Sequence, residues 1–352
     1  ITAAPDIPEK SIAVLPFTDM SPEGDQAYFA DGIAEEILDE LAQSPDLKVT
    51  ARSSSFVFRD SDEDLRTIGQ KLGVAHVLEG SVRKDADRVR VTAQLVDTRS
   101  GFHLWSQEYD RNTGEVLDIQ DSIGTEVANA LQVALLDSAT GEILYAQELE
   151  PRVYDLFLKA KNLFNHGRKD SLIEATTLLN EVIEVDPDFH RARVLLIDST
   201  LSLAGEFGVW PEADSASRSA QKMLLYGRLE NEVREVINVE PGLAEAHLVL
   251  GKLMHAQCYT DDAELAVLEA LKINPNLAEA HRYLGSSIYR GTFASLNKTT
   301  VRLRRAVELD PYSVLSRMQL AMSLSAIPDL REEAWTVFRG SQMILPWTPF
   351  IG

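Results

Sequence analysis

Residues 241–275 read PGLAEAHLVLGKLMHAQCYTDDAELAVLEALKINP, two helix-like runs that end at a proline. The same layout recurs along the chain, because prolines 241, 275, 311 and 346 lie 34, 36 and 35 residues apart (275 − 241, 311 − 275 and 346 − 311). A period near 34 with a terminal proline is typical of stacked helix-turn-helix units. Such stacks build concave surfaces that hold other chains. The pattern therefore favours a protein that binds a partner over an enzyme.

The packing positions inside this unit alternate large and small side chains. Leu250 and Gly251 fall on the first helix, and Ala263, Val267 and Ala270 fall on the second. Small residues let neighbouring helices approach, and large residues fill the space between them. On these residues the segment resembles the tetratricopeptide repeat family, whose fold is an all-α superhelix.

We place this repeat region at residues 152–346 and count five units. The second unit is irregular, because Pro187 and Pro241 lie 54 residues apart (241 − 187). The excess falls around residues 205–217, GEFGVWPEADSAS, as a loop extension of one unit or as a distortion of the stack. Unit four carries a two-residue insertion near Gly291.

The preceding region, residues 9–137, has a different pattern. Apolar runs at 11–17 and 47–51 predict strands, and helical spacing predicts helices over 28–42, 62–72 and 116–136. Between them the period changes to two, which predicts antiparallel strands near 76–84, 88–95 and 102–109. The order predicts an α+β domain, a mixed sheet with packed helices.

Several segments of this region carry a second resemblance. They are SIAVLPFTDMSPEGDQAYFADGIAEEI (11–37), DLRTIGQKLGVAHVLEGSVRK (64–84) and RVRVTAQLVDTRSGFHLWSQEYDR (88–111). These closely resemble the TolB-like amino-terminal domain. The resemblance implies a domain that precedes tetratricopeptide repeats in bacterial proteins, carboxy-terminal to class III adenylate cyclase or winged-helix regulator domains. It also implies a periplasmic or membrane-anchored, periplasm-facing location, with the cytoplasm as the alternative.

Composition narrows the classes of partner. The chain has 352 residues, with 34 Lys and Arg against 55 Asp and Glu, a net charge of −21 that would repel nucleic acid and anionic lipid. The single cysteine, Cys258, excludes an intrachain disulfide. We find no membrane span. Residues 1–8 and 138–151 are interpreted as linkers, residues 347–352 as the start of a truncated continuation, and both ends as cuts in a longer protein.

In tetratricopeptide repeats the first helix of each unit lines the concave face. Projecting that pattern predicts a basic and aromatic patch that would seat an acidic or carboxylate-ended peptide. The alternative is that these are ordinary solvated residues. The predicted partner-binding residues are Glu245, Lys252, His255, Arg282, Tyr289, Arg290, Met318 and Met322, with Leu315 continuing the surface.

Other candidate sites have structural explanations. His247 and His281 share one repeat position, which helix packing explains better than a metal pair. The run Asp60, Asp62 and Asp64 is interpreted as a helix cap rather than a calcium loop. Glu35 and Glu36 are interpreted as acids near the start of a helix that complement its dipole. The aromatic residues Phe102, Trp105 and Tyr109 are predicted to face the domain core. We therefore predict no catalytic residues, no metal and no cofactor.

These observations predict a non-catalytic protein-interaction scaffold that binds a protein or peptide in the concave groove, as part of a bacterial regulatory or envelope protein. Two alternatives stay open: the regulatory tail of an upstream adenylate cyclase or transcription-regulator domain, and a structural subunit of an envelope complex. The identity of the partner and the oligomeric state, a homo-oligomer included, are not determined by the sequence.

Overall fold

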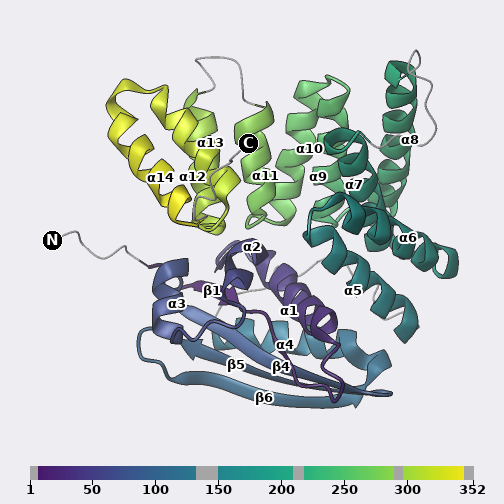
Figure 1. Cartoon of the computed structure of the whole chain (residues 1–352), viewed down its shortest axis with the longest axis vertical. Coiled ribbons are helices and arrows are strands. Elements are labelled where there is room, and N and C mark those ends of the chain that lie inside the picture. Colours follow the sequence, from purple (N-terminus) through teal and green to yellow (C-terminus); the bar gives the residue numbers. More distant parts are fainter. Residues whose placement is uncertain (1–6, 132–149, 209–217, 289–295, 345–352) are drawn as a thin grey trace, which may run out of the picture.

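The computed structural model describes residues 7–131, 150–208, 218–288 and 296–344. It shows a sheet domain, residues 7–131, and a repeat domain, residues 150–344, whose helices form an arc over one side of the sheet domain (Figure 1). Within these ranges no helix is both long and apolar enough to cross a membrane.

The sheet domain is built on a mixed sheet of six strands, in agreement with the sequence prediction. Its order is β3-β1-β4-β5-β6, with β2 pairing beside β4. β1 runs parallel to β3 and β4, whereas β4, β5 and β6 form an antiparallel meander. The strands are β1 (Ser11–Val14), β2 (Thr18–Asp19), β3 (Lys48–Val49), β4 (His76–Asp85), β5 (Arg88–Asp97) and β6 (His103–Asn112).

Helices cover both faces of this sheet because side chains alternate along its strands. Ile12 and Val14 of β1 point into the core under α1 (Ala27–Ala42) and α4 (Val116–Ala130), whereas Ala13 points into a smaller core with Leu72 of α3 (Leu65–Leu72). Between β3 and α3 lie α2 (Arg52–Ser55) and the short 3-10 helix η1 (Phe56–Phe58). A second 3-10 turn, η2 (Thr113–Glu115), leads into α4.

The cap predicted for α3 is confirmed. The Asp64 carboxylate accepts a 2.8 Å hydrogen bond from the Thr67 backbone N–H, and Gly73 ends the helix in the left-handed region at φ 65°. The assignment of Phe102 to the core is wrong, because this side chain is 73% exposed at the β5–β6 turn. Tyr109 is buried, and Trp105 donates a 2.9 Å hydrogen bond to Glu126 of α4.

In the described ranges the repeat domain contains five helix pairs, each packed against the next. Unit two is α7 (17 residues) and α8 (22 residues), longer than α9 (13 residues) and α10 (14 residues) of unit three. Part of the predicted insertion therefore lengthens the helices, and residues 209–217 lie outside the described ranges. The pairs are α5 (Pro151–Asn165) with α6 (Lys169–Val185), α7 (His190–Glu206) with α8 (Arg218–Val239), α9 (Ala244–Ala256) with α10 (Thr260–Ile273), α11 (Ala278–Tyr283) with α12 (Leu296–Leu309), and α13 (Val314–Ser325) with α14 (Arg331–Ile344).

Unit four departs from the repeat next to its predicted insertion. α11 continues into η5 (Leu284–Ile288), which is a turn of π-helix and so accommodates an extra residue. Gly291 itself lies outside the described residues. In unit five a 3-10 turn, η7 (Pro328–Leu330), precedes α14.

Small residues occupy the contact positions inside the units, as the sequence predicts. A Cβ on Gly251 of α9 would overlap the Val267 side chain and lie 3.1 Å from the carbonyl oxygen of Ala263. A Cβ on Gly285 would lie 2.7 Å from Cγ of Leu303. Within unit three, and likewise within unit four, the two helices are therefore packed as closely as a glycine at the contact permits.

The shared position of His247 and His281 has a structural role. Nε2 of His247 lies 2.9 Å from the carbonyl oxygen of Pro241, and Nε2 of His281 lies 3.1 Å from that of Pro275. In unit five the same position is Arg317, whose Nε donates to the Pro311 carbonyl at 2.5 Å. A side chain six residues after each proline thus ties the inter-unit turn to the next helix.

We expect Gly251→Ala to lower the free energy of unfolding by about 1–3 kcal/mol, because the added methyl group forces α9 and α10 apart. Gly227→Ala on α8 is the matched control, since a Cβ there meets nothing within 4 Å. The control should be neutral or stabilising by up to about 1 kcal/mol. Urea denaturation measures both, and an equal effect of the two variants would contradict the close-contact explanation.

Candidate functional site

Three acidic residues of α1 contact the repeat domain. Glu35, Glu36 and Asp39 lie in the second half of a helix that starts at Ala27, and Glu35 and Glu36 are each only 7% exposed. The first turn of α1 contains no acidic residue, so the assignment of Glu35 and Glu36 to the helix dipole is wrong. Their partners come from elsewhere in the chain.

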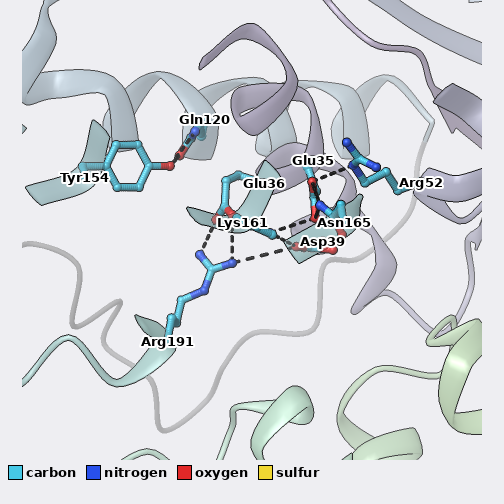
Figure 2. Close-up of polar contacts among 9 residues, drawn as sticks. All are labelled: Glu35, Glu36, Asp39, Arg52, Gln120, Tyr154, Lys161, Asn165 and Arg191. Carbon is cyan, nitrogen blue, oxygen red and sulfur yellow. Dashed lines mark hydrogen bonds and ion pairs between the residues drawn. The ribbon is translucent and has the colours of Figure 1, made fainter. Parts of the chain in front are cut away.

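Basic and amide side chains of three other helices meet these acids (Figure 2). Lys161 of α5 contacts all three, at 3.3 Å from Glu35, 2.7 Å from Glu36 and 2.8 Å from Asp39. Arg191 of α7 binds both oxygens of Glu36. We name this set the ion-pair cluster; its members are Glu35, Glu36, Asp39, Arg52, Lys161, Asn165 and Arg191.

Because the ion-pair cluster is buried, its charged groups depend on partners from the other domain. Burial alone would raise the pKa of Glu36, but Arg191 and Lys161 outweigh it and lower that pKa to about 2. Burial likewise lowers the pKa of Lys161, yet Asp39, Glu35 and Glu36 hold it well above its usual range. These groups are therefore charged at neutral pH, and each depends on partners from the other domain.

An apolar core lies beside the ion-pair cluster and also spans the two domains. Leu158 of α5 packs on α1 at Gly32, where a Cβ would lie 2.7 Å from Cδ2 of Leu158. Tyr154 of α5 exchanges hydrogen bonds of 2.9 and 3.0 Å with Gln120 of α4 (Figure 2). Residues of α5, α6 and α7 belong to the same buried cluster as the sheet, including Val153, Phe157, Leu158, Leu179, Val182 and Ala192, together with Phe189 just before α7.

Farther along the arc, two inter-unit turns dock on the sheet domain. Asn276, which follows Pro275, donates to the carbonyl oxygens of Ala42 at 2.9 Å and Leu47 at 2.8 Å. Its side-chain oxygen accepts from the Val49 N–H at 3.3 Å. A single buried amide thereby satisfies backbone groups at the end of α1 and along β3.

The next turn uses the equivalent positions around Pro311. Asp310 accepts hydrogen bonds from the hydroxyl groups of Ser53, at 2.7 Å, and Ser54 on α2. The Ser54 hydroxyl in turn accepts from the Tyr312 N–H at 2.8 Å, and the Tyr312 ring packs edge-on against Phe58. We name 274–276 and 310–312 the docking turns.

The predicted partner-binding residues of units three and four are largely engaged inside the chain. Lys252 forms ion pairs with Asp198 at 3.0 Å and Glu279 at 2.8 Å, and Arg282 lies 3.5 Å from the same Glu279. Lys252 has only 13% of its side chain exposed.

The remaining predicted residues have different surroundings. His255 on α9 lies with Nδ1 3.1 Å from the hydroxyl of Tyr283. On α13, Met318 and Met322 are 43% and 61% exposed, and Leu315 is also exposed. Tyr289 and Arg290 lie outside the described residues. Their role in binding a partner stays a prediction.

A cavity of about 190 Å³ lies between α1 and the first helices of units one to four. Its polar wall includes Asp39, Lys161, Arg191 and Glu245, and its apolar wall includes Leu248. Burial and the nearby Asp39 raise the pKa of Glu245, and burial and the neighbouring acids raise the pKa of Asp39. In the part of the chain that the structure describes, no group of three or more His, Cys, Asp or Glu is arranged to hold a metal ion.

The sequence prediction named Glu245 as a partner-binding residue of the groove, which stays a prediction, and it did not predict the ion-pair cluster or the docking turns. One signal was present: Lys161 and Arg191 occupy first helices of their units, where they would face the concave side. The acids of α1 were the complementary signal. Nothing in the periodicity showed that the two faces meet.

A second carboxyl group of α1, Glu40, faces α4. A Cβ on Gly124 of α4 would clash with its carboxylate, so the two helices are in close contact there. Burial, together with Asp121 and Glu36, raises the pKa of Glu40 to about 8. In the described residues no basic group forms an ion pair with Glu40.

Comparison with known proteins gives partial matches. A sequence profile described as the second domain of HilA/YgeH-like transcriptional regulators matches residues 8–126. A protein of Rhizobium meliloti (strain 1021) named "Putative adenylate cyclase 3" is 34% identical over 263 residues, which is 74% of this chain and 43% of that protein. The chain thus spans less than half of this relative. The TolB-like resemblance is not confirmed by these matches.

Solved structures match a little over half of the chain. A thermophilic TPR protein of Thermus thermophilus has 18% identity and a TM-score of 0.43, over 56% of this chain and 93% of that one. MamA of Desulfovibrio magneticus RS-1 has 19% identity and a TM-score of 0.35, over 53% of this chain and 94% of that one. The assignment of repeats rests on the helix pairs of this chain itself.

We expect Asn276→Ala to lower the free energy of unfolding by about 3 kcal/mol, because it leaves buried backbone groups of the sheet domain without partners. It should also raise the radius of gyration in small-angle X-ray scattering, as the later units separate from β3. Asn180→Ala, an exposed asparagine on α6, is the control and should stay within about 0.5 kcal/mol of the wild type. An unchanged Asn276→Ala protein would refute the docking contact.

We expect Glu40→Gln to stabilise the protein at high pH. A folded-state pKa of about 8, above the ordinary 4.5, means that the stability contributed by protonated Glu40 is present below pH 4.5 and is lost as the pH rises from there to about 8. The variant should gain on the order of 2 kcal/mol at pH 8.5 and little at pH 4. Urea denaturation at both pH values measures this, with the exposed Glu184→Gln as control. A pH-independent effect would contradict the account.

Proposed function

We propose that the chain is a non-catalytic protein-interaction module that serves as the regulatory region of a larger signalling protein. The observation that carries the proposal is the docked arrangement: the repeat domain is fixed on the sheet domain by the ion-pair cluster, a shared core and the docking turns. The charged residues of the site are used to hold two domains together. Because the two domains share a buried core, we expect such a module to move as a single body.

The surface offered to a protein partner lies in the last unit. Leu315, Met318 and Met322 follow at i, i+3 and i+7 along α13, so they form one apolar stripe, and all three are exposed. Methionine-rich surfaces adapt to apolar side chains of a partner. The partner proposed here is therefore a polypeptide segment with an apolar face.

The partner surface predicted in units three and four is less open than this stripe. Lys252 and Arg282 both share Glu279, and Lys252 also binds Asp198. An acidic peptide would have to displace these acids before it could bind. The acidic character of the partner and the periplasmic or cytoplasmic location stay predictions.

A double variant, Met318→Asp with Met322→Asp, tests the proposal. The wild-type chain is used to capture partners from a cell extract, and the captured protein is then titrated against purified wild type and variant by calorimetry. We expect at least a tenfold loss of affinity in the double variant, because two carboxylates would be buried against apolar side chains. The control is Met223→Asp on α8, an exposed methionine outside the stripe. Equal affinity of wild type and double variant would exclude the α13 surface.

The similarity to the protein named as an adenylate cyclase supports a second proposal, that this region regulates a nucleotide cyclase domain of the same polypeptide. In a polypeptide containing both regions, Asn276→Ala should change the rate of cyclic AMP formation, whereas Asn180→Ala should not. An unchanged rate with Asn276→Ala would remove the support for cyclase regulation.

A further inference from the structure

The two edges of the sheet differ in length and in what covers them. At one edge, β3 is two residues long, and Asn276 of a docking turn accepts a hydrogen bond from the Val49 N–H. At the other edge, β6 is ten residues long, contains neither proline nor glycine and, within the described ranges, pairs with β5 alone. It lies on the side of the sheet domain away from the repeat arc (Figure 1). An edge strand of this length offers a row of unpaired backbone groups to a further strand.

The hydrogen bonds to β5 determine which backbone groups of β6 point outward. The Thr113 N–H donates to the carbonyl oxygen of Asp87 at 2.9 Å, and the register runs unbroken from there to Leu95. Because hydrogen-bonded and non-hydrogen-bonded pairs alternate along an antiparallel ladder, the odd-numbered residues of β6 bond to β5. The even-numbered residues Ser106 and Glu108, whose side chains are exposed, therefore direct their N–H and C=O groups away from the sheet.

A β-bulge limits the regular part of this edge. The register shifts between Leu95 and Val96, which leaves Leu104 of β6 without a counterpart on β5. A bulge disrupts the ladder locally and bends the strand. The regular part of the edge is therefore residues 105–112.

This regular part reads WSQEYDRN, and it is complementary to itself in an antiparallel register. With Gln107 opposite its own counterpart in a second copy, Ser106 lies opposite Glu108 and Trp105 lies opposite Tyr109. A serine hydroxyl donates readily to a carboxylate, and aromatic pairs across strands are favourable. Each of these pairs occurs twice, once on either side of the two-fold axis through Gln107.

The neighbouring registers bring like charges or the bulge into the pairing. A register centred on Glu108 places two glutamates opposite each other, and one centred on Tyr109 places Glu108 opposite Asp110. A register centred on Ser106 places the bulged residue Leu104 opposite Glu108. Like charges directly opposite each other are destabilising, so the register centred one residue before Glu108 is favoured.

The charges beyond this centre are compensated within the chain. Asp110 forms ion pairs with Arg88 and Arg90 of β5, and Arg111 lies 3.9 Å from Glu115. These groups flank the pairing and require no charged counterpart across it.

We propose that the chain forms a symmetric dimer, in which the β6 strands of two copies pair antiparallel around Gln107 and join the two sheets into one. The two pairs of Ser106 with Glu108 are hydrogen-bonded pairs, so they supply about four backbone hydrogen bonds. The repeat arc of each copy lies away from this edge, and the α13 surface stays open in both (Figure 1). The dimer would thus present two α13 surfaces to protein partners.

Sedimentation velocity of the purified chain between about 5 and 300 µM tests the dimer. We expect a monomer–dimer equilibrium with a Kd on the order of 10–100 µM. Ser106→Glu places a second carboxylate opposite Glu108 and should weaken the dimer at least tenfold. Ser106→Lys, the matched variant at the same exposed position, places an ammonium group there and should dimerise at least as tightly as the wild type.

A cysteine cross-link tests the register. In a Cys258→Ser background, Gln107→Cys should form a disulfide-linked dimer on mild oxidation, because the two Cα atoms would lie about 4.5 Å apart. Arg111→Cys is the matched control, since its two copies would lie about 26 Å apart along the strands.

The proposal is overturned by any one of three results. They are a wild-type chain that stays monomeric at about 300 µM, equal dimerisation of the two Ser106 variants, and an Arg111→Cys variant that cross-links as well as Gln107→Cys. None of these measurements involves α13, so this test and that of the proposed protein partner fail independently.

Discussion

The contact of Glu36 on α1 with Arg191 on α7, joined by Lys161 on α5, is the interaction on which the arrangement of the two domains depends. A buried carboxylate is tolerated only with partners, and Glu36 has its partners in the first two repeat units. The sheet domain cannot bury this face of α1 without the repeats. The repeats cannot bury Lys161 without α1. Each domain therefore completes the other.

This constraint explains which part of the concave surface remains open. The first helices of units one to four face α1 across a cavity of about 190 Å³, and the docking turns hold units three and four against β3 and α2. Only α13 presents an exposed apolar stripe on the first helix of its unit, among the helices that the structure describes. In units one to four the first helices of the repeats face the sheet domain of the same chain. The surface is thus available to another chain only in the last unit.

The sequence predicted the elements well and their assembly poorly, for physical reasons. Proline spacing and the contact glycines Gly251 and Gly285 report local geometry, which each unit repeats, so five units were predictable. The cap at Asp64 is equally local. Docking depends on groups far apart in the sequence, such as Asn276 with Ala42 and Asp310 with Ser53. Periodicity shows that a face is buried without showing what buries it, and this is why Glu36 was assigned to a helix dipole.

Hydrogen exchange of the backbone amides, followed by mass spectrometry, tests most directly whether the two domains form one cooperative unit. The account predicts that α1, α5 and α7 exchange with the same opening free energy as the central strands β4 and β5, because one core and one ion-pair cluster hold them together. Exchange of α5 and α7 at a much lower free energy, while β4 and β5 stay protected, would contradict it.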